Sequence, residues 1–331
     1  MLIPTLLFLF GLLLLVRGGD LFVDGATGIA LRFRMPEALI GATVVSIGTT
    51  LPEVTVSATS AFRGVGGMSY GNAIGSIICN TALVAAVTIT LRPKRVDRQA
   101  LLPPILFFFG ALTVYLFSAY YLRRFSGIIG AILLLLFVAY ITVSVLIARA
   151  DTRVKRKPCE TDDTTLSSPS PKKIQRASRE LLLLAIGAAA IAFGADLLVE
   201  NGQLIAKNLN IPETIVALLF ISLGTSLPEL VTAITALVKG HAALSLGNII
   251  GANFLNLTLV TGISALVGPF DLPVAKEIAG IPSSLIVDLP ITLLVMLLLT
   301  LPTVLRAKVY RIQGILLLSV YVLFSMLTLS L

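Results

Sequence analysis

Two glutamates stand inside long apolar runs of this chain, where a charged side chain requires a compensating partner. Glu53 ends the segment SIGTTLPE at residues 46–53, and Glu229 ends the similar segment SLGTSLPE at residues 222–229. A proline within a helix removes one backbone hydrogen bond and clashes with the preceding turn. Inside a bilayer such a break is tolerated only where the freed backbone faces protein or a wet cavity. Each segment therefore predicts a broken helix whose carbonyl, hydroxyl and carboxylate oxygens can hold a cation.

A second polar motif recurs on the next predicted helix of each half. It reads SYGNAIGSIICN at residues 69–80 and SLGNIIGANFLN at residues 245–256. Its glycines, four residues apart, favour close packing of two helices. Packing does not explain Asn80 and Asn256, and Ser76 lies on the same helix face as Asn80. We expect Ser76 and Asn80 to supply neutral oxygens opposite Glu53.

The two glutamates have no basic partner near the middle of any predicted span. The nearest basic residue, Arg17, can pair with Asp20 or Asp24. A charge at the centre of a bilayer costs roughly 2.5–3.5 kcal/mol on insertion scales. Oxygen ligands suit Ca²⁺ and also Na⁺, and two carboxylates are neutralised equally by one Ca²⁺ or two Na⁺. The sequence thus predicts one site for which both ions compete. The hydroxyl groups beside the glutamates are those of Thr49, Thr50, Thr225 and Ser226.

Both motifs belong to an internal duplication. An offset of 176 residues places Pro36–Asn80 on Pro212–Asn256 without a gap and also pairs Asp20 with Asp196. A chance alignment of two apolar segments would not match Pro, Gly, Glu and Asn at equivalent positions. Each half contains five predicted spans, so the second half must enter the membrane from the opposite side. Such inverted repeats are typical of secondary transporters, whose sites lie between the repeats near mid-membrane.

The composition is that of a polytopic membrane protein. Of the 331 residues, 56% are hydrophobic and 13% charged, against about 25% charged in soluble domains. At about 20 apolar residues per span, the sequence predicts an all-α fold of ten transmembrane helices. The first run is expected to be a retained span, because it lacks the basic region and cleavage site of a signal peptide. The helices are expected at residues 3–31, 37–62, 68–91, 99–121, 125–148, 180–206, 213–238, 243–268, 279–303 and 311–330.

A polar stretch at residues 150–179 separates the two membrane repeats, residues 1–149 and 180–331. It is rich in Lys, Arg, Ser and Pro and has no apolar periodicity, which predicts a flexible linker. Most other Lys and Arg residues fall in gaps on the same side of the membrane as this linker. Basic residues collect on the cytoplasmic side. We therefore expect a multi-pass plasma-membrane protein with both termini outside and the linker in the cytoplasm, and the net charge of +8 does not indicate nucleic acid.

Cofactor chemistry is not indicated by the sequence. Cys79, Cys159 and His241 form no metal-ligand pattern or disulfide framework, and His241 is interpreted as a loop residue at the start of a span. We expect no cofactor, no enzymatic activity and no obligate protein partner. The expected partners are Ca²⁺, Na⁺ and the lipid bilayer.

At these motifs the sequence resembles the cation/calcium exchanger superfamily, specifically its prokaryotic sodium/calcium exchangers. The GTTLPE, GTSLPE, GNAIG and GNIIG segments are similar to the two alpha-repeats of that family, and with GDLFV at residues 19–23 the likeness covers essentially the whole membrane domain. The resemblance implies exchange of Ca²⁺ for Na⁺ by alternating access, with the first and sixth spans sliding across the core. The ligands that it implies for four central sites are Glu53, Glu229, Thr49, Thr225, Ser76, Asn80 and Asn256. Ser46 and Ser222 stand where the family uses a backbone carbonyl.

Two departures from the family pattern affect the sodium sites that the resemblance implies. Asn256 stands where some relatives have Asp, and Ala252 stands where they have Ser. The two-glutamate calcium site survives both changes. The number of Na⁺ ions per cycle, and dependence on Na⁺ rather than H⁺ or K⁺, are left open.

Other functions fit the residues less well. A Ca²⁺/H⁺ antiporter on the same scaffold usually has Gly-Asn directly before its glutamate segment, whereas here Gly-Asn lies on the next helix. An intramembrane protease requires a Ser–His pair or two membrane aspartates, for which this sequence offers no suitable arrangement. An ion channel is a further alternative, but inverted repeats with broken helices favour alternating access.

Overall fold

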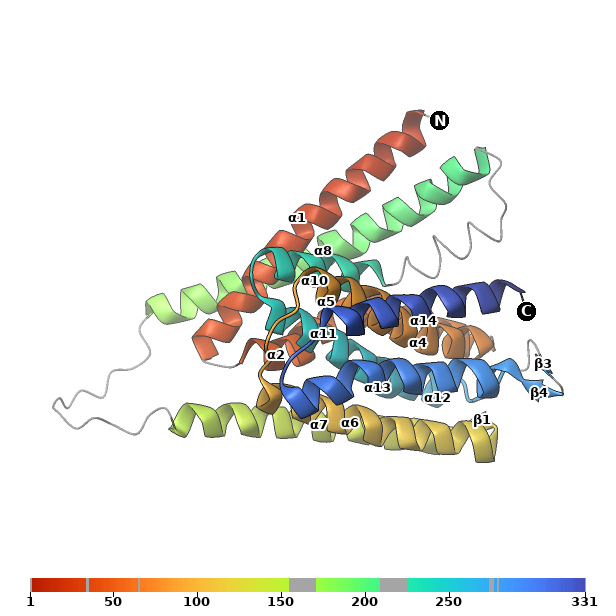
Figure 1. Cartoon of the computed structure of the whole chain (residues 1–331). Helices are drawn as coiled ribbons and strands as arrows, with labels where there is room; N and C mark the ends of the chain where they lie inside the picture. Colours follow the sequence, from red (N-terminus) through yellow and green to blue (C-terminus); the bar gives the residue numbers. More distant parts are fainter. Residues whose placement is uncertain are drawn as a thin grey trace.

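The computed structural model describes residues 2–33, 36–64, 66–154, 171–208, 226–273, 277–278 and 280–330. This part of the chain is helical apart from two short strand pairs, which confirms the all-α membrane fold (Figure 1). In the element labels, η marks a π-helical turn. The first half contains α1 (Leu2–Phe33), α2 (Glu37–Ile40), η1 (Gly41–Val45), α3 (Ser46–Phe62), α4 (Gly66–Cys79), η2 (Asn80–Ala85), α5 (Ala86–Leu91), α6 (Arg98–Phe117), η3 (Ser118–Leu122), β1 (Arg124–Phe125) and α7 (Gly127–Val154). The second half contains α8 (Pro171–Asn208), α10 (Leu227–Val238), α11 (Ala242–Leu255), η5 (Asn256–Val260), α12 (Thr261–Val267), β2 (Phe270–Asp271), β3 (Glu277–Ile278), β4 (Ile281–Pro282), η6 (Ser284–Asp288), α13 (Leu289–Arg306) and α14 (Arg311–Ser330).

Each of the ten predicted spans contains a described helix. Within the described residues, eight helical runs are long and apolar enough to cross a membrane, and α10 is a shorter apolar helix. The remaining helix, α8, contains the predicted sixth span. Large apolar side chains are exposed along α1, α7 and α14, as expected for surfaces that contact lipid.

The centre of the molecule is α11, in which every residue from Leu244 to Leu255 is buried. It packs against the second span, formed by α2, η1 and α3, and against α10 and α6. Aromatic side chains support it from outside: the rings of Phe254 and Tyr140 lie 4.8 Å apart, edge to face. The third and eighth spans, which carry the Gly-Asn motifs, are the two most buried of the described spans, at 72% and 83%.

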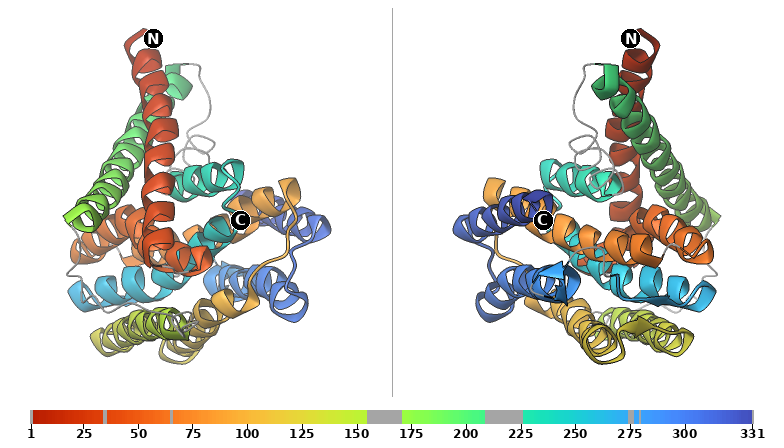
Figure 2. Two further views of the ribbon diagram at one scale, coloured as in Figure 1. Left: turned by 90° about the vertical axis from the view of Figure 1, so that its left-hand side faces the viewer. Right: turned by 90° about the vertical axis from the view of Figure 1, so that its right-hand side faces the viewer.

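A pair of long helices, α1 and α8, lies to one side of the other helices (Figures 1 and 2). Their contact is close because glycines face the neighbouring backbone. A Cβ atom added to Gly187 would lie 2.5 Å from the nitrogen of Phe22, and one on Gly18 would lie 2.9 Å from that of Ile191. Near one end of the pair, Arg32 and Glu180 approach to 3.9 Å. The two helices thus form one closely packed body.

The second span is a continuous helix with a π-helical turn, and not the broken helix that the sequence predicted. It is helical from Glu37 to Phe62, with a π-helical turn at η1 and Pro52 inside α3. Pro52 has no N–H, so the carbonyl of Gly48 loses its helical donor, yet the helix continues. In the seventh span α10 begins at Leu227, and the predicted residues 213–225 lie outside the described residues.

Two predicted boundaries need correction. The expected linker at residues 150–179 is helical at both ends, because α7 continues to Val154 and α8 begins at Pro171. Proline fits the first turn of a helix, where its missing N–H has no partner to lose, and no further Gly or Pro follows before the span. Residues 155–170 of the linker lie outside the described part.

The predicted ninth span, from residue 279, begins later than expected. A hairpin of β3 and β4 precedes it, closed by Gly280 at φ +78°, and the helical run starts at Ser284. The other strand pair joins the two halves: β1 and β2 are antiparallel, with Arg124 opposite Asp271.

Candidate cation site

Glu53 and Glu229 occupy different local positions on their helices, although the repeat relates them. Glu53 lies within α3 directly after Pro52, whereas Glu229 lies in the first turn of α10. The unpaired N–H groups and dipole of a helix N-terminus favour a negative charge there. Both side chains are completely buried. A carboxylate from each repeat is therefore held inside the protein.

The carboxylates influence each other electrostatically and lack partners among the described residues. Glu53 is within electrostatic reach of Glu229, and Glu229 lies beside the hydroxyl groups of Thr49 and Thr50. Within the described residues, none of the four carboxylate oxygens has a well-formed hydrogen bond, and no basic side chain forms an ion pair with either glutamate. An unpaired buried charge is strongly unfavourable. When both are ionised, the two groups require a counter-charge that the described residues do not supply.

Further buried oxygens without partners occur in repeat-related pairs. Thr50 and Ser226, and likewise Asn80 and Asn256, are buried and have no hydrogen bond from their side chains within the described residues. The offset of 176 residues relates the members of each pair. Native proteins leave few buried polar groups unpaired, so these repeat-related unpaired groups are candidate ligands.

Asn80 and Asn256 each begin a π-helical turn. The turn η2 starts at Asn80 and η5 starts at Asn256. Single π-helical turns inside α-helices are frequent at functional sites, because the extra residue re-aims the side chains around it. The backbone carbonyl of Asn256 accepts a hydrogen bond from the Thr261 hydroxyl at 3.1 Å. The sequence predicted these side chains as ligands but gave no signal for the π-helical turns.

Asn72 and Asn248, the asparagines of the two Gly-Asn motifs, connect helices at the site, a role that the sequence did not predict. Asn72 donates to the backbone oxygen of Glu53 at 3.3 Å and to the Ser57 hydroxyl at 2.8 Å. In the other repeat, Asn248 donates to the Thr232 hydroxyl at 3.1 Å. Each asparagine thus ties its helix to the helix that carries the glutamate. The exact duplication of Gly-Asn was the signal that could have found them.

One contact joins the repeats directly at the site. The hydroxyl of Thr49 lies 3.3 Å from the side-chain oxygen of Asn248 and equally 3.3 Å from the carbonyl oxygen of Ser46. Thr232, which receives the Asn248 amide, in turn donates to the carbonyl of Pro228 at 2.8 Å. A chain of polar contacts therefore runs from α3 through α11 to α10.

The remaining candidate ligands are placed as follows. Ser76 is buried on α4. Ser46 is buried, and its hydroxyl donates to the Thr43 carbonyl at 3.1 Å within the same helical run. Ser222 and Thr225 lie outside the described residues.

Glycines bring α11 into contact with the second span. A Cβ atom on Gly251 would lie 2.5 Å from Cα of Ala42, and one on Gly247 would clash with the Ala38 carbonyl. This is the close helix packing expected for the glycine motif. The equivalent Gly71 and Gly75 meet nothing within 4 Å among the described residues. Close packing thus explains the motif in the second repeat only.

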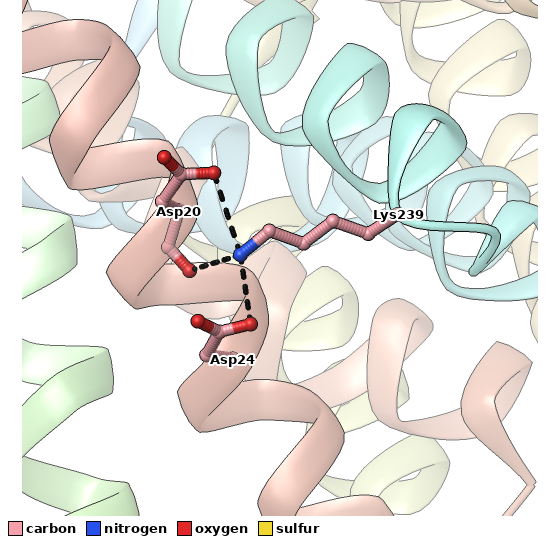
Figure 3. A network of polar contacts seen from close by, with 3 residues as sticks. All are labelled: Asp20, Asp24 and Lys239. Carbon is pink, nitrogen blue, oxygen red and sulfur yellow. Dashed lines mark hydrogen bonds and ion pairs between the residues drawn. The ribbon is translucent and has the colours of Figure 1, made fainter.

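Asp20 and Asp24 do not pair with Arg17, as the sequence suggested, but with Lys239. The Lys239 ammonium group lies 2.7 Å from Oδ1 of Asp24 and 3.3 Å from Oδ1 of Asp20 (Figure 3). Lys239 lies in the other repeat, 215 residues from Asp24 along the chain, so no local pattern indicated this pair. His241, expected in a loop, directly precedes α11 and contacts Glu37 at 2.9 Å.

The donor set defines what the site can bind. Within the described residues, no group of three or more His, Cys, Asp or Glu side chains could hold a metal. The site offers two carboxylates with hydroxyl and amide oxygens, which suit weakly held, exchangeable hard cations rather than transition metals.

Comparison with known proteins finds relatives that cover most of the chain. The family model described as sodium/calcium exchanger protein matches residues 3–146 and 179–330. The chain is 35% identical to the inner membrane protein YrbG of Escherichia coli over 272 residues, covering 81% of each chain. It is 29% identical to the sodium/calcium exchanger MaX1 of Methanosarcina acetivorans, covering 96% of each.

A solved structure has the same fold over nearly the full length of both chains. The sodium-calcium exchanger NCX_Mj, soaked with Na⁺ and Sr²⁺, superposes with a TM-score of 0.78 at 30% identity, covering 97% of each chain. This multi-pass membrane protein therefore belongs to the sodium/calcium exchanger family and is a cation antiporter.

Proposed function

We propose that the chain exchanges Ca²⁺ for Na⁺ across the membrane and binds both ions between Glu53 and Glu229. The observation that carries the proposal is the set of buried side-chain oxygens, in repeat-related pairs, that have no partner among the described residues. Each pair contributes one member from each repeat, which supports a binding site between the repeats. This is where inverted-repeat transporters bind their substrates.

Charge balance explains why two ions compete for the site. With both glutamates ionised and asparagine at positions 80 and 256, the ligand groups carry two negative charges. One Ca²⁺ or two Na⁺ neutralise them equally. Either load removes the cost of two unpaired buried carboxylates, whereas the unloaded site retains it. The protein should therefore change conformation more readily loaded than unloaded, which couples the movement of one ion to that of the other.

Movement of the α1–α8 pair supplies the alternating access in this proposal. These helices pack closely with each other and lie beside the core that carries the glutamates. A rigid pair that slides across the core can cover the site from one side and then from the other. The proposed topology places both termini outside and the segment between α7 and α8 in the cytoplasm, as the distribution of Lys and Arg favours.

Uptake of radioactive Ca²⁺ into proteoliposomes tests the counter-ion. Vesicles carrying the purified protein are loaded with Na⁺, with K⁺ or with an outward proton gradient, and diluted into medium with labelled Ca²⁺. We expect concentrative uptake only from Na⁺-loaded vesicles. Uptake driven by protons or K⁺ alone would identify that ion, instead of Na⁺, as the counter-ion. Uptake that never exceeds equilibrium would indicate a channel.

A further inference from the structure

Lys239 connects the end of α10 to α1 through two carboxylates. Its ammonium group lies 2.7 Å from Oδ1 of Asp24 and 3.3 Å from Oδ1 of Asp20, and it donates to the Asp20 carbonyl at 3.0 Å. Figure 3 shows the lysine reaching across from α10 to both acidic side chains of α1. We call these three residues the Lys239 cluster. It fixes the sliding helix α1 to the core at one face of the protein.

The internal repeat duplicates this arrangement. Lys239 caps the C-terminus of α10 and is followed by Gly240 at φ +89°, and Arg63 caps the C-terminus of α3 and is followed by Gly64 at φ +78°. The same offset of 176 residues that relates the two turns relates Asp20 to Asp196 and Asp24 to Glu200 on α8. Arg63, Asp196 and Glu200 form the second set, the Arg63 cluster.

The second set is not joined in this structure. Arg63, Asp196 and Glu200 are all exposed, and none of them has an ion-pair partner among the described residues. The helices that carry the two clusters also differ in how closely they pack against the core. A Cβ atom on Gly19 of α1 would lie 2.8 Å from Val231 of α10, whereas α8 makes only sparse contact with α3. One half of the repeat is thus closed against the core and the other is open.

We propose that the two clusters are alternative latches, of which only one is closed at a time. Because the repeats are inverted, the clusters lie at opposite faces of the membrane. The α1–α8 pair is one closely packed body, so docking it at the Lys239 cluster withdraws it from the Arg63 cluster. In this structure the Lys239 latch is closed. The opposite transport state opens it and joins Arg63 to the acidic residues of α8.

This inference rests on the proposed alternating access but not on the identity of the transported ions. Partly exposed ion pairs are weak, so each latch biases the equilibrium between two states without locking it. A weak latch at each face suits a transporter, because a strong one would trap the protein in a single state.

Cross-linking of paired cysteines tests whether both clusters close. In protein with Cys159 replaced by serine, one variant carries Asp24→Cys with Lys239→Cys and another carries Arg63→Cys with Glu200→Cys. The control variant carries Asp24→Cys with Glu200→Cys, which lie near opposite ends of the antiparallel α1–α8 pair. A protease site between α7 and α8 separates the halves unless a short thiol cross-linker joins them. The readout is a gel, so it does not depend on which cation is transported.

We expect both latch variants to cross-link and the control not to. Adding Lys239→Gln to the Arg63→Cys, Glu200→Cys variant should raise its cross-linking rate about fivefold, the size of effect expected of a partly exposed ion pair. If the Arg63→Cys, Glu200→Cys variant cross-links no faster than the control, or if Lys239→Gln leaves its rate unchanged, the alternative latches do not exist. If both latch variants cross-link and Lys239→Gln raises the rate, but the protein does not transport Ca²⁺, the latches are upheld and the proposed ion is rejected.

Discussion

The hydroxyl of Thr49 lies 3.3 Å from the side-chain oxygen of Asn248, across the boundary between the two repeats. Thr49 comes from the helix of Glu53, and Asn248 also contacts Thr232 on the helix of Glu229. One asparagine therefore fixes the relative positions of the two helices that carry the carboxylates. Its contribution is positional, since it lies between the helices rather than among the unpaired oxygens.

Asn248→Ala should reduce transport by moving the glutamate helices relative to each other. Loss of a buried hydrogen-bonding group costs about 1–3 kcal/mol, and we expect a matching loss of thermal stability in detergent. Asn208→Ala is the control, because Asn208 is exposed and, among the described residues, its side chain donates only to the Leu204 carbonyl of its own helix at 2.8 Å. Transport and stability of Asn248→Ala equal to those of the control would contradict the positional role.

Gly251→Ala should destabilise the protein by forcing α11 away from the second span. The added Cβ would lie 2.5 Å from Cα of Ala42 and 2.6 Å from its carbonyl oxygen, and overpacking of this kind costs about 1–3 kcal/mol. Gly110→Ala on α6 is the matched control. Its Cβ meets nothing within 4 Å among the described residues, so the better helix propensity of alanine should stabilise by about 0.5–1 kcal/mol. Thermal unfolding that ranks the two variants in the opposite order would refute the packing argument.

Introducing a hydroxyl at Ala252 and a carboxylate at Asn256 should change the sodium dependence of transport. The departure at both positions from relatives that have Ser and Asp there predicts that the native chain binds fewer Na⁺ ions per cycle than those relatives. We expect a sodium Hill coefficient of about two, rising in the double variant Ala252→Ser, Asn256→Asp. Moving one net charge through 100 mV is worth about 2.3 kcal/mol, so a cycle without net charge should be almost insensitive to voltage. A wild-type coefficient near three with strong voltage dependence would rule this out.

The segment between α7 and α8 should be cytoplasmic. A specific protease site inserted there is expected to be cut in inside-out membrane vesicles and to resist protease added to intact cells. Cleavage from the outside of intact cells would invert the proposed topology. The same insertion tests whether the two repeats remain associated after cleavage, as their shared core requires.

Much of the fold follows from residues that the sequence repeats. Glu53 with Glu229 and Asn80 with Asn256 were found because charged and amide side chains are unfavourable in apolar spans. Their recurrence at equivalent positions of the two repeats indicated a shared function. The spans followed from apolar length, and the boundaries of the second span, Glu37 and Phe62, agree with the structure.

Features set by tertiary contact were not predictable in the same way. The pairing of Lys239 with Asp24 joins residues far apart in the sequence, and Arg17 was a nearer candidate. The π-helical turns at Asn80 and Asn256 leave no local mark, because they depend on how the spans pack. The helical ends of the expected linker were missed because a polar run beginning at Pro171 lacks the apolar period on which the prediction of spans relied.

The central claim is that Glu53 and Glu229 together bind the transported Ca²⁺. The most direct test compares labelled Ca²⁺ uptake into Na⁺-loaded proteoliposomes by wild type, Glu53→Gln and Glu229→Gln, with Asp271→Asn as a control. Asp271 lies on β2 with its side chain 76% exposed, so its loss should leave uptake unchanged. Each glutamine variant removes half the formal charge of the site while keeping its shape, and should fold normally but abolish uptake. Near-normal uptake by either glutamine variant would contradict the claim.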